Sequence, residues 1–201
     1  AFIPIKSVHA SDIYEEAGKI LYDLGVLTGI NKEGDLGLGN HLNRQDMVVL
    51  ISRLYGKEDE AKKFDDPKTP NTFKDLAGQS DRIKFYTPYI RWAVSEGLMK
   101  GHADGTFGFD EDVTVQQFQT VLLRALQYND EANDWNNVPD HAKKYKLMEG
   151  LTLDPNAGLT RGQMAVMTLN ALKQEINRGL ITLAEYLDLD IPAEFQVEAT
   201  V

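Results

Sequence analysis

The clearest feature of the chain is a stripe of apolar residues at helical spacing that occurs three times. Side chains at positions i, i+3, i+4, i+7 and i+8 lie on one face of a helix, and each stripe follows that spacing. The stripes are Met47, Leu50, Ile51, Leu54 and Tyr55; Phe118, Val121, Leu122, Ala125 and Leu126; and Met164, Met167, Thr168, Ala171 and Leu172. A pattern used three times indicates a repeat architecture.

Each stripe follows the same helix-start template, in which an apolar residue, a capping residue and two further residues precede an acid or amide. The three copies are Leu42–Asp46, Val113–Gln117 and Leu159–Gln163. The second residue of each copy stands where an N-cap belongs, and the last completes a capping box. Capping accounts for these positions without a ligand, but two of the caps, Asn43 and Thr160, adjoin arginines and are kept as ligand-binding candidates.

A second helical segment and a glycine-flanked turn precede each start. The first segment runs from Ile13 to Leu24 and stops at Gly25, and the second opens near Pro88 and stops at Gly97. The third, from His141 to Met148, is weaker and has Lys146 where the others have glycine. A loop follows each turn, and in the middle copy its Asp-Gly pair and alternating phenylalanines predict a tight turn with a short extended arm.

These elements predict a mainly α fold of three helix-loop-helix repeats that share one core. We expect a first module over 1–56, a linker and second module over 57–130, a third module over 131–173, and a helix with an exit linker over 174–201. Residues 56–80 read as a surface connection, and Phe73 and Trp135 as aromatic staples. At the N-terminus, packing of Phe2 and Ile5 on the domain and the end of a secretory signal at 8–10 are both open.

Composition narrows the classes of function. The chain has 201 residues, a formal net charge of -10 and no cysteine. This charge disfavours binding to nucleic acid or to an anionic membrane surface, and no apolar run approaches the roughly 20 residues of a membrane-spanning helix. No cofactor or metal is indicated. The four histidines form no His-x-x-x-His pair, so we do not expect an enzyme, although carboxylates are plentiful enough to leave a glycosidase pair open.

Arg44 and Arg161 carry the sharpest hypothesis. Both fall at the first helical position, where the helix dipole makes a cation unfavourable by roughly 0.3–1 kcal/mol. A bound anion reverses that sign, because free N–H groups, the dipole and the guanidinium then converge on one carboxylate. The alternative is a surface arginine paired with a neighbouring acid in this acidic chain.

Other candidates have ordinary structural explanations beside the functional one. Gly29, Gly101 and Gly150 would let the backbone approach a sugar, or simply end helices. Trp92 would stack on a sugar face, or belong to the core. Asp104 in the Asp-Gly loop is a ligand-binding candidate but lacks the acidic ladder of a calcium loop.

Taken together, these motifs resemble the S-layer homology family, whose modules fasten proteins to bacterial cell walls. The second unit matches best, through its aromatic-x-Asp start at 73–75, its turn at 97–101 and its Asp-Gly-x-Phe loop at 104–107. The family's Thr-Arg-Ala-Glu element is similar to the residues at 43–46, 114–117 and 160–163, although no copy is complete and Val115 replaces the arginine in the second.

The resemblance implies three modules around a pseudo-threefold axis, with binding grooves between neighbours. It also implies an extracellular location at the bacterial wall or S-layer and, as partner, a secondary wall polysaccharide that often carries a pyruvate ketal. Possible self-assembly with other surface proteins is part of the same expectation. Two rival functions remain: an enzyme acting on wall glycan, and a scaffold whose repeats pack against a partner protein.

Overall fold

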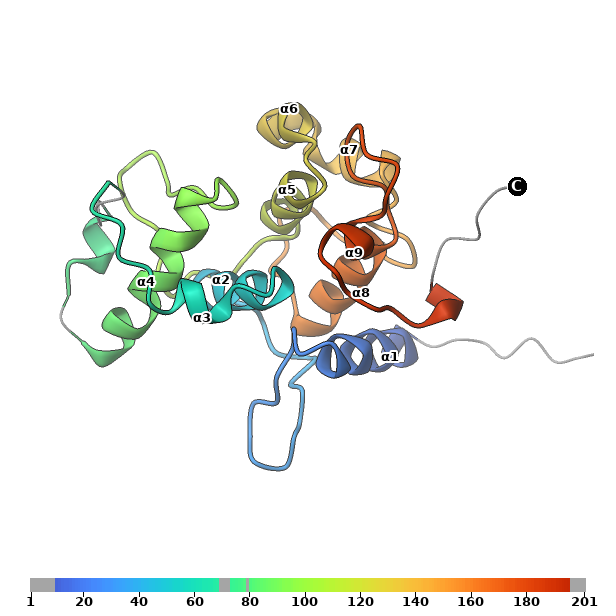
Figure 1. The fold of residues 1–201 in the computed structure, drawn as a ribbon, viewed down its shortest axis with the longest axis horizontal. Coiled ribbons are helices and arrows are strands. Elements are labelled where there is room, and N and C mark those ends of the chain that lie inside the picture. Colours follow the sequence, from blue (N-terminus) through green and yellow to red (C-terminus); the bar gives the residue numbers. More distant parts are fainter. Residues whose placement is uncertain (1–9, 69–72, 79, 196–201) are drawn as a thin grey trace, which may run out of the picture.

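The computed structural model describes residues 10–68, 73–78 and 80–195, and it is mainly α-helical (Figure 1). The expectations for residues 1–9 lie outside this part of the chain. The longer helices are α1 (Ala10–Asp23), α2 (Arg44–Leu54), α4 (Asp81–Ser95), α5 (Val115–Ala125), α7 (Val138–Lys144) and α8 (Arg161–Leu172). Short helices are α3 (Glu58–Ala61), α6 (Asn129–Asn133) and α9 (Leu183–Tyr186), and 3-10 turns occur at Lys74–Leu76, Trp135–Asn137 and Ala193–Phe195.

The six longer helices form three sequence units: α1 with α2, α4 with α5, and α7 with α8. Packing does not follow these units. The first helix of each unit packs mainly against the second helix of another: α4 on α2, α7 on α5, and α1 on α8, which closes the ring (Figure 1). The three units therefore depend on one another, because each lends a helix to its neighbour.

The starts of α2, α5 and α8 meet in a closed cycle of backbone hydrogen bonds. The amide of Leu42 donates to the carbonyl of Leu159 at 2.9 Å, Leu159 donates to Val113 at 2.8 Å, and Val113 donates to Leu42 at 2.8 Å. These residues occupy the same template position, and all three are buried. A cycle of this kind is what a pseudo-threefold axis requires at one point; the arrangement of whole modules stays a prediction.

The predicted capping boxes form at two of the three helix starts. Thr114 with Gln117, and Thr160 with Gln163, make both reciprocal bonds. At α2, Asn43 accepts from the amide of Asp46, but the expected return bond is replaced. The Asp46 carboxylate instead accepts the hydroxyl proton of Tyr86 on α4. Here a contact between units overrides local capping chemistry.

The structure changes one helix boundary and supports an unusual alignment. Helix α4 begins at Asp81, with Ser80 as its N-cap, so Pro88 lies inside the helix rather than near its start. Lys146 has a φ of 58°, close to the 74° of Gly25 and the 71° of Gly97. The lysine thus adopts the left-handed conformation that glycine supplies in the other two units.

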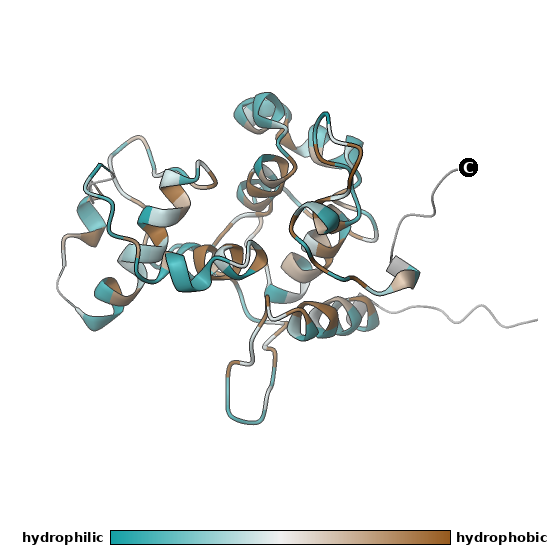
Figure 2. Ribbon diagram, viewed as in Figure 1, coloured by the Kyte–Doolittle hydropathy of each residue, from teal (hydrophilic) through white to brown (hydrophobic). Residues whose placement is uncertain are grey.

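The segments between and after the units are more structured than expected. The surface connection contains α3 and a 3-10 turn, and the described loops form isolated bridges rather than named strands. Only α9 forms within 174–189, but Leu183, Ala184 and Ile191 are buried, so the supposed exit linker joins the core as far as Ile191. Figure 2 shows apolar faces along the longer helices turned toward one another.

Candidate functional site

The first backbone N–H groups of α2 and α8 donate to carbonyls of other units. At α2 the N–H of Arg44 donates to the carbonyl of Glu111 at 2.9 Å. At α8 the N–H groups of Arg161 and Gly162 donate to loop carbonyls at 2.9 and 2.8 Å, and the next amide donates to the cap. Backbone bonds between units therefore take the first N–H of α2 and the first two of α8, so these donors are not free for an anion.

The Arg44 side chain is a tie between units. Its Nε donates to the carbonyl of Phe107 at 2.7 Å and its Nη2 to that of Lys100 at 2.9 Å. The residue is only 4% exposed, and its guanidinium carbon lies 4.9 Å from the centre of the Phe107 ring. Burial lowers the pKa of Arg44, which the carboxylates of Glu111 and Asp75 partly offset. Arg44 is thus neither a surface ion pair nor an unattached cation.

Arg161 makes the equivalent tie to the loop of the first unit. Its Nε donates to the carbonyl of Leu36 at 2.9 Å, and its Nη2 donates to the carbonyl of Thr28 at 2.8 Å. Thr28 occupies the same turn position as Lys100. Each arginine therefore reaches from the capped helix of one unit into the turn and loop of another.

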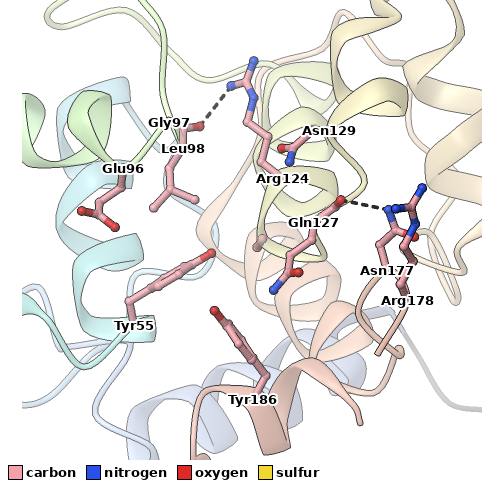
Figure 3. A pocket seen from close by; sticks show the side chains of 11 residues that line it. Tyr55, Glu96, Gly97, Leu98, Arg124, Gln127, Asn129, Asn177, Arg178 and Tyr186 are labelled. Atoms are coloured by element: carbon pink, nitrogen blue, oxygen red, sulfur yellow. Dashed lines mark hydrogen bonds between the residues drawn. The ribbon is translucent and has the colours of Figure 1, made fainter. Parts of the chain in front are cut away.

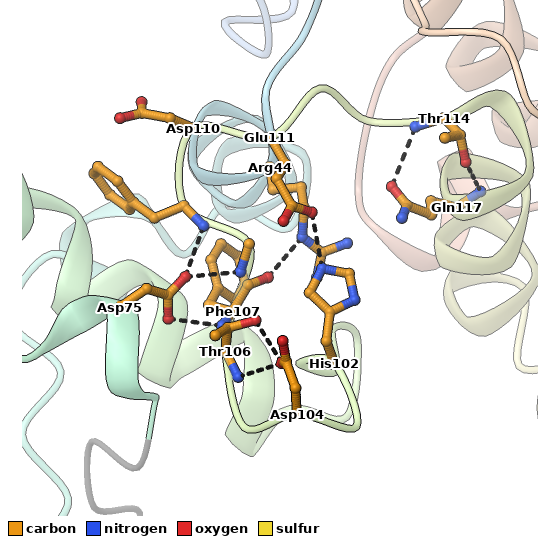
Figure 4. Close-up of polar contacts among 12 residues, drawn as sticks. Arg44, Asp75, His102, Asp104, Thr106, Phe107, Asp110, Glu111, Thr114 and Gln117 are labelled. Atoms are coloured by element: carbon orange, nitrogen blue, oxygen red, sulfur yellow. Dashed lines mark hydrogen bonds and ion pairs between the residues drawn. The ribbon is translucent and has the colours of Figure 1, made fainter.

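Asp75 fixes the loop that receives Arg44 (Figure 4). Its carboxylate accepts the backbone N–H groups of Phe107, Gly108 and Phe109 at 2.8, 2.8 and 2.9 Å. Burial alone would raise the pKa of Asp75, but these three bonds outweigh it and the pKa is lowered. The aromatic-x-Asp motif at 73–75 thereby holds the carbonyl of Phe107 in place for Arg44.

A polar network surrounds this tie. Gln45 exchanges two hydrogen bonds with Asp110, at 2.6 and 2.9 Å, and Arg82 pairs with the same carboxylate at 2.7 Å. His102 lies 2.9 Å from the carboxylate of Glu111. The loop of the second unit is therefore held from several directions beside the start of α2.

A cavity of about 390 Å³, here called groove A, adjoins this junction. Its lining residues are Arg44, Met47, Met99, Lys100, Gly101, His102, Gln117, Thr120, Val121, Arg124, Ala132, Asn133 and Trp135. Among the described residues, Arg44 and Arg124 have no carboxylate within ion-pair distance, and each donates to backbone carbonyls instead. Trp135 is 49% exposed at the same groove.

Comparison with known proteins places this region in a family. Residues 80–117, from α4 through the Asp-Gly loop to the start of α5, match the S-layer homology domain. The matched segment contributes much of the wall of groove A, including Gly101 and His102.

Three curated relatives are surface proteins. The chain is 27% identical over 81% of its length to the middle cell wall protein of Brevibacillus brevis, and 26% identical over 94% to a cell surface protein of Thermoanaerobacter kivui. It is 22% identical over 78% to the cellulosome-anchoring protein of Acetivibrio thermocellus. The chain spans 15%, 23% and 36% of these relatives, so what each whole protein does is not carried over directly.

The two tryptophans lie in very different environments. Trp92 is 1% exposed in the core and edge-on to the ring of Tyr55, so its core interpretation agrees with the structure and it offers no face to a sugar. Trp135, expected as a staple, is half exposed at groove A. Its residue type is a usable signal for sugar stacking, but its position just before a predicted helix indicates an aromatic staple instead.

Gly101 and Arg44 come together in groove A, while the remaining candidates lie elsewhere. A Cβ on Gly101 would lie 2.1 Å from the Phe73 ring, so close packing requires glycine there. Gly29 packs against the backbone of Gly34, and Gly150 has a φ of 77°. Neither Gly29, Gly150 nor Arg161 is among the residues that line groove A.

The caps and Asp104 use their oxygens locally. The side-chain oxygens of Asn43 and Thr160 accept from their own helices. Asp104 is exposed, and its Oδ1 accepts from both the amide and the hydroxyl of Thr106 at 2.9 and 2.7 Å. Arg124 and Lys100, which sequence reasoning missed, are better placed for a ligand because they line groove A.

The structure also bears on metal binding, on the histidines and on membrane-spanning helices. Within the described ranges, no group of three or more His, Cys, Asp or Glu side chains is arranged to hold a metal ion. His41, like His102, pairs with a surface carboxylate, and so does His141 with Asp134. None of the described helices combines the length and apolar character needed to cross a membrane.

Proposed function

We propose that this chain is a non-covalent anchoring module that binds an anionic bacterial wall polysaccharide in groove A. The observation that carries the proposal is the convergence of Arg44, Arg124 and Lys100 beside the exposed ring of Trp135. These cations gather in one groove although the whole chain carries a net charge of -10. A groove of this composition suits a polymer whose sugars carry a carboxylate.

Arg44 and Arg124 would bind the carboxylate of a pyruvate ketal. Guanidinium groups recognise carboxylates through charge-assisted hydrogen bonds, and Nη1 of Arg44 makes no hydrogen bond to any described residue. The indole of Trp135 would pack against the sugar ring, since an exposed aromatic face suits the apolar face of a pyranose. Gln117 and Thr120 add polar groups to the same wall.

The relatives support a surface role for the protein that carries this chain. Their names are those of cell wall, cell surface and anchoring proteins, and the S-layer homology match lies at groove A. We infer that the module holds an exported protein at the wall without catalysing a reaction, and that neighbouring surface proteins can assemble beside it. The pseudo-threefold arrangement of three modules is part of this proposal.

The test is sedimentation with purified, protein-free wall sacculi. We expect the chain to bind intact sacculi and to lose binding after acid removal of the secondary polymer. Trp135→Ala should weaken binding without unfolding the chain, whereas Tyr22→Ala on α1, an equally exposed aromatic, should not. Binding that survives stripping, or equal behaviour of the two variants, would contradict groove A as the polymer site.

The same experiment separates the rival functions. Release of reducing ends from the sacculi, lost on mutating an acid, would support an enzyme acting on glycan. A scaffold that packs only against a partner protein would not bind protein-free sacculi. Neither result is expected, because the lining of groove A includes Arg44, Lys100 and Arg124 but no Asp or Glu.

A further inference from the structure

A second polar cavity lies between the ends of three helices and the C-terminal segment (Figure 3). It has a volume of about 450 Å³, and we call it the end cavity. Its lining residues are Tyr55, Glu96, Gly97, Leu98, Arg124, Ala125, Gln127, Asn129, Asn177, Arg178 and Tyr186. Of these, only Arg124 also lines groove A.

The C-terminal segment is fixed to the bundle where it forms the wall. The N–H of Asn177 donates to the carbonyl of Leu126 at 2.8 Å, and its side-chain amide donates to that of Gln127 at 3.2 Å. A bridge between Glu175 and Thr182 closes the following turn, and α9 is anchored by its buried first residue. The end cavity is therefore a shaped feature of the fold rather than a gap beside a loose tail.

Two arginines in the end cavity have no ionic partner. Neither Arg124 nor Arg178 has a carboxylate within 4.0 Å anywhere in the described structure, whereas Arg53, Arg82 and Arg91 each have one. Burial lowers the pKa of Arg124, and no nearby acid offsets it. Arg124 is partly buried and Arg178 is exposed, and neither guanidinium is paired with a carboxylate of the described residues, so both leave room for an anion.

The other lining groups are suited to hydroxyls. Figure 3 shows the hydroxyls of Tyr55 and Tyr186 directed into the same space, with the amides of Gln127 and Asn129 on the opposite side. Tyrosine, amide and guanidinium groups together can both donate to and accept from a polyol. The single lining carboxylate, Glu96, leaves the cavity with an excess of positive charge.

We propose that the end cavity is a second binding site, for a monosaccharide-sized polyol that carries one carboxylate or phosphate. It takes one sugar unit, because its volume is at the small end of ligand pockets. Arg178, which lines only the end cavity, binds the anionic group, and the tyrosine hydroxyls and the side-chain amides bind the hydroxyls. This inference is independent of groove A, which the polymer would occupy whether or not the end cavity is filled.

The test is an NMR titration of the full ¹⁵N-labelled chain with methyl glucuronide, glycerol phosphate and, as a neutral match, methyl glucoside. We expect saturable shifts at the amides of Gly97, Gln127 and Arg178 with an anionic probe and none with the glucoside. Arg178→Gln should raise the Kd about tenfold or more, the cost of one charge-assisted hydrogen bond. Lys84→Gln removes the same charge from the exposed face of α4 and should change nothing.

The anionic probes and a groove A variant locate and classify the site. Tighter binding of the glucuronide indicates a sugar acid, and tighter binding of glycerol phosphate indicates a phosphorylated polyol. Trp135→Ala should leave the shifts unchanged, because Trp135 lies in groove A. The proposal is overturned by an absence of saturable shifts, by equal shifts with the glucoside, by unchanged affinity in Arg178→Gln, or by shifts confined to Gly101 and His102. None of these results bears on binding of wall polymer to groove A.

Discussion

The starts of α2 and α5, here called the Arg44 junction and the Val115 junction, make the same kind of backbone hydrogen bond to another unit but differ in their side chains. In both, the first residue of the helix donates its N–H to a loop of another unit, at 2.9 and 3.0 Å. Arg44 then extends into that loop, while Val115 is simply buried. The backbone frame can therefore form without the arginine, and the arginine determines how firmly the turn and loop beyond it are held.

The cavity at the Val115 junction reflects this difference. Its lining residues are Gln119, Pro139, Lys143, Lys146, Met148, Glu149, Leu151, Thr152, Leu153 and Pro155. Two exposed lysines, Lys143 and Lys146, are among them, and no arginine is. Gln119 is 2% exposed, and its Oε1 has no partner among the described residues. We therefore expect the wall polymer to favour groove A.

The most drastic way to break both junctions is to open the ring of helices. A fragment of residues 1–60 contains α1 and α2 but lacks α8 and α4, against which these two helices pack. Isolated short helices are marginal in water, so the fragment should be largely disordered. Circular dichroism with thermal melting checks this against the full chain, which should unfold in one transition. A sharp transition in the fragment would show that the first unit folds alone.

The comparison predicts a large loss of stability when Arg44 is replaced and a smaller loss when Val115 is replaced. Arg44→Ala removes two hydrogen bonds from a charged donor, and we expect a loss of about 3 kcal/mol or more in the free energy of unfolding. Val115→Ala leaves a small cavity and should cost about 1–2 kcal/mol. Urea unfolding gives both values, and calorimetry with wall polymer should show a loss of affinity only for Arg44→Ala.

Arg161→Ala is the matched test of this distinction. It should destabilise the fold nearly as much as Arg44→Ala, because it also loses two bonds to loop carbonyls. Its effect on polymer binding should be smaller, since Arg161 does not line groove A. Equal polymer affinity in the parent and both arginine variants, measured where all are folded, would remove the arginines from the binding site.

Acid should loosen the Arg44 junction before the Val115 junction. The folded-state pKa of Asp75 is lowered, so its stabilisation is fully present above the ordinary pKa of about 3.9 and is lost as pH falls through the lower folded value. Below about pH 4 we expect the amides of Phe107, Gly108 and Phe109 to lose protection from hydrogen exchange, measured relative to the unfolded chain at the same pH. Asp75→Asn should show that loss of protection at neutral pH and lose this acid dependence. Unchanged protection of these amides in the variant would exclude Asp75 as the group that holds the loop.

The sequence predicts where the helices lie along the chain but not which helices pack together. Apolar spacing and capping residues act locally, so the sequence predicts α2, α5 and α8 closely and aligns Lys146 with the glycines whose left-handed φ it shares. The exchange of helices between units is a long-range choice that a stripe does not encode. The sequence marks Arg44 as unusual for its place at a helix start, but its partners, the carbonyls of Phe107 and Lys100, are backbone groups that any residue carries. Trp135 was missed because an exposed ring leaves no periodic signal.

The smallest expected effect, and the finest test of groove A, is the response of binding to salt. The net charge of -10 repels an anionic polymer at long range, while Arg44, Arg124 and Lys100 attract one carboxylate at short range. Added salt screens the repulsion as well as the attraction, so moderate salt should weaken binding only slightly or even strengthen it.

Heparin, a generic polyanion, should compete poorly, whereas removal of the ketal carboxylate from the wall polymer should abolish binding. Calorimetry across a salt series measures this, with Lys84→Gln as a control for general surface charge. A steep loss of affinity with salt, together with strong competition by heparin, would mean that diffuse charge rather than the shaped groove binds the polymer, and the contrast between the Arg44 and Val115 junctions would then have no bearing on anchoring.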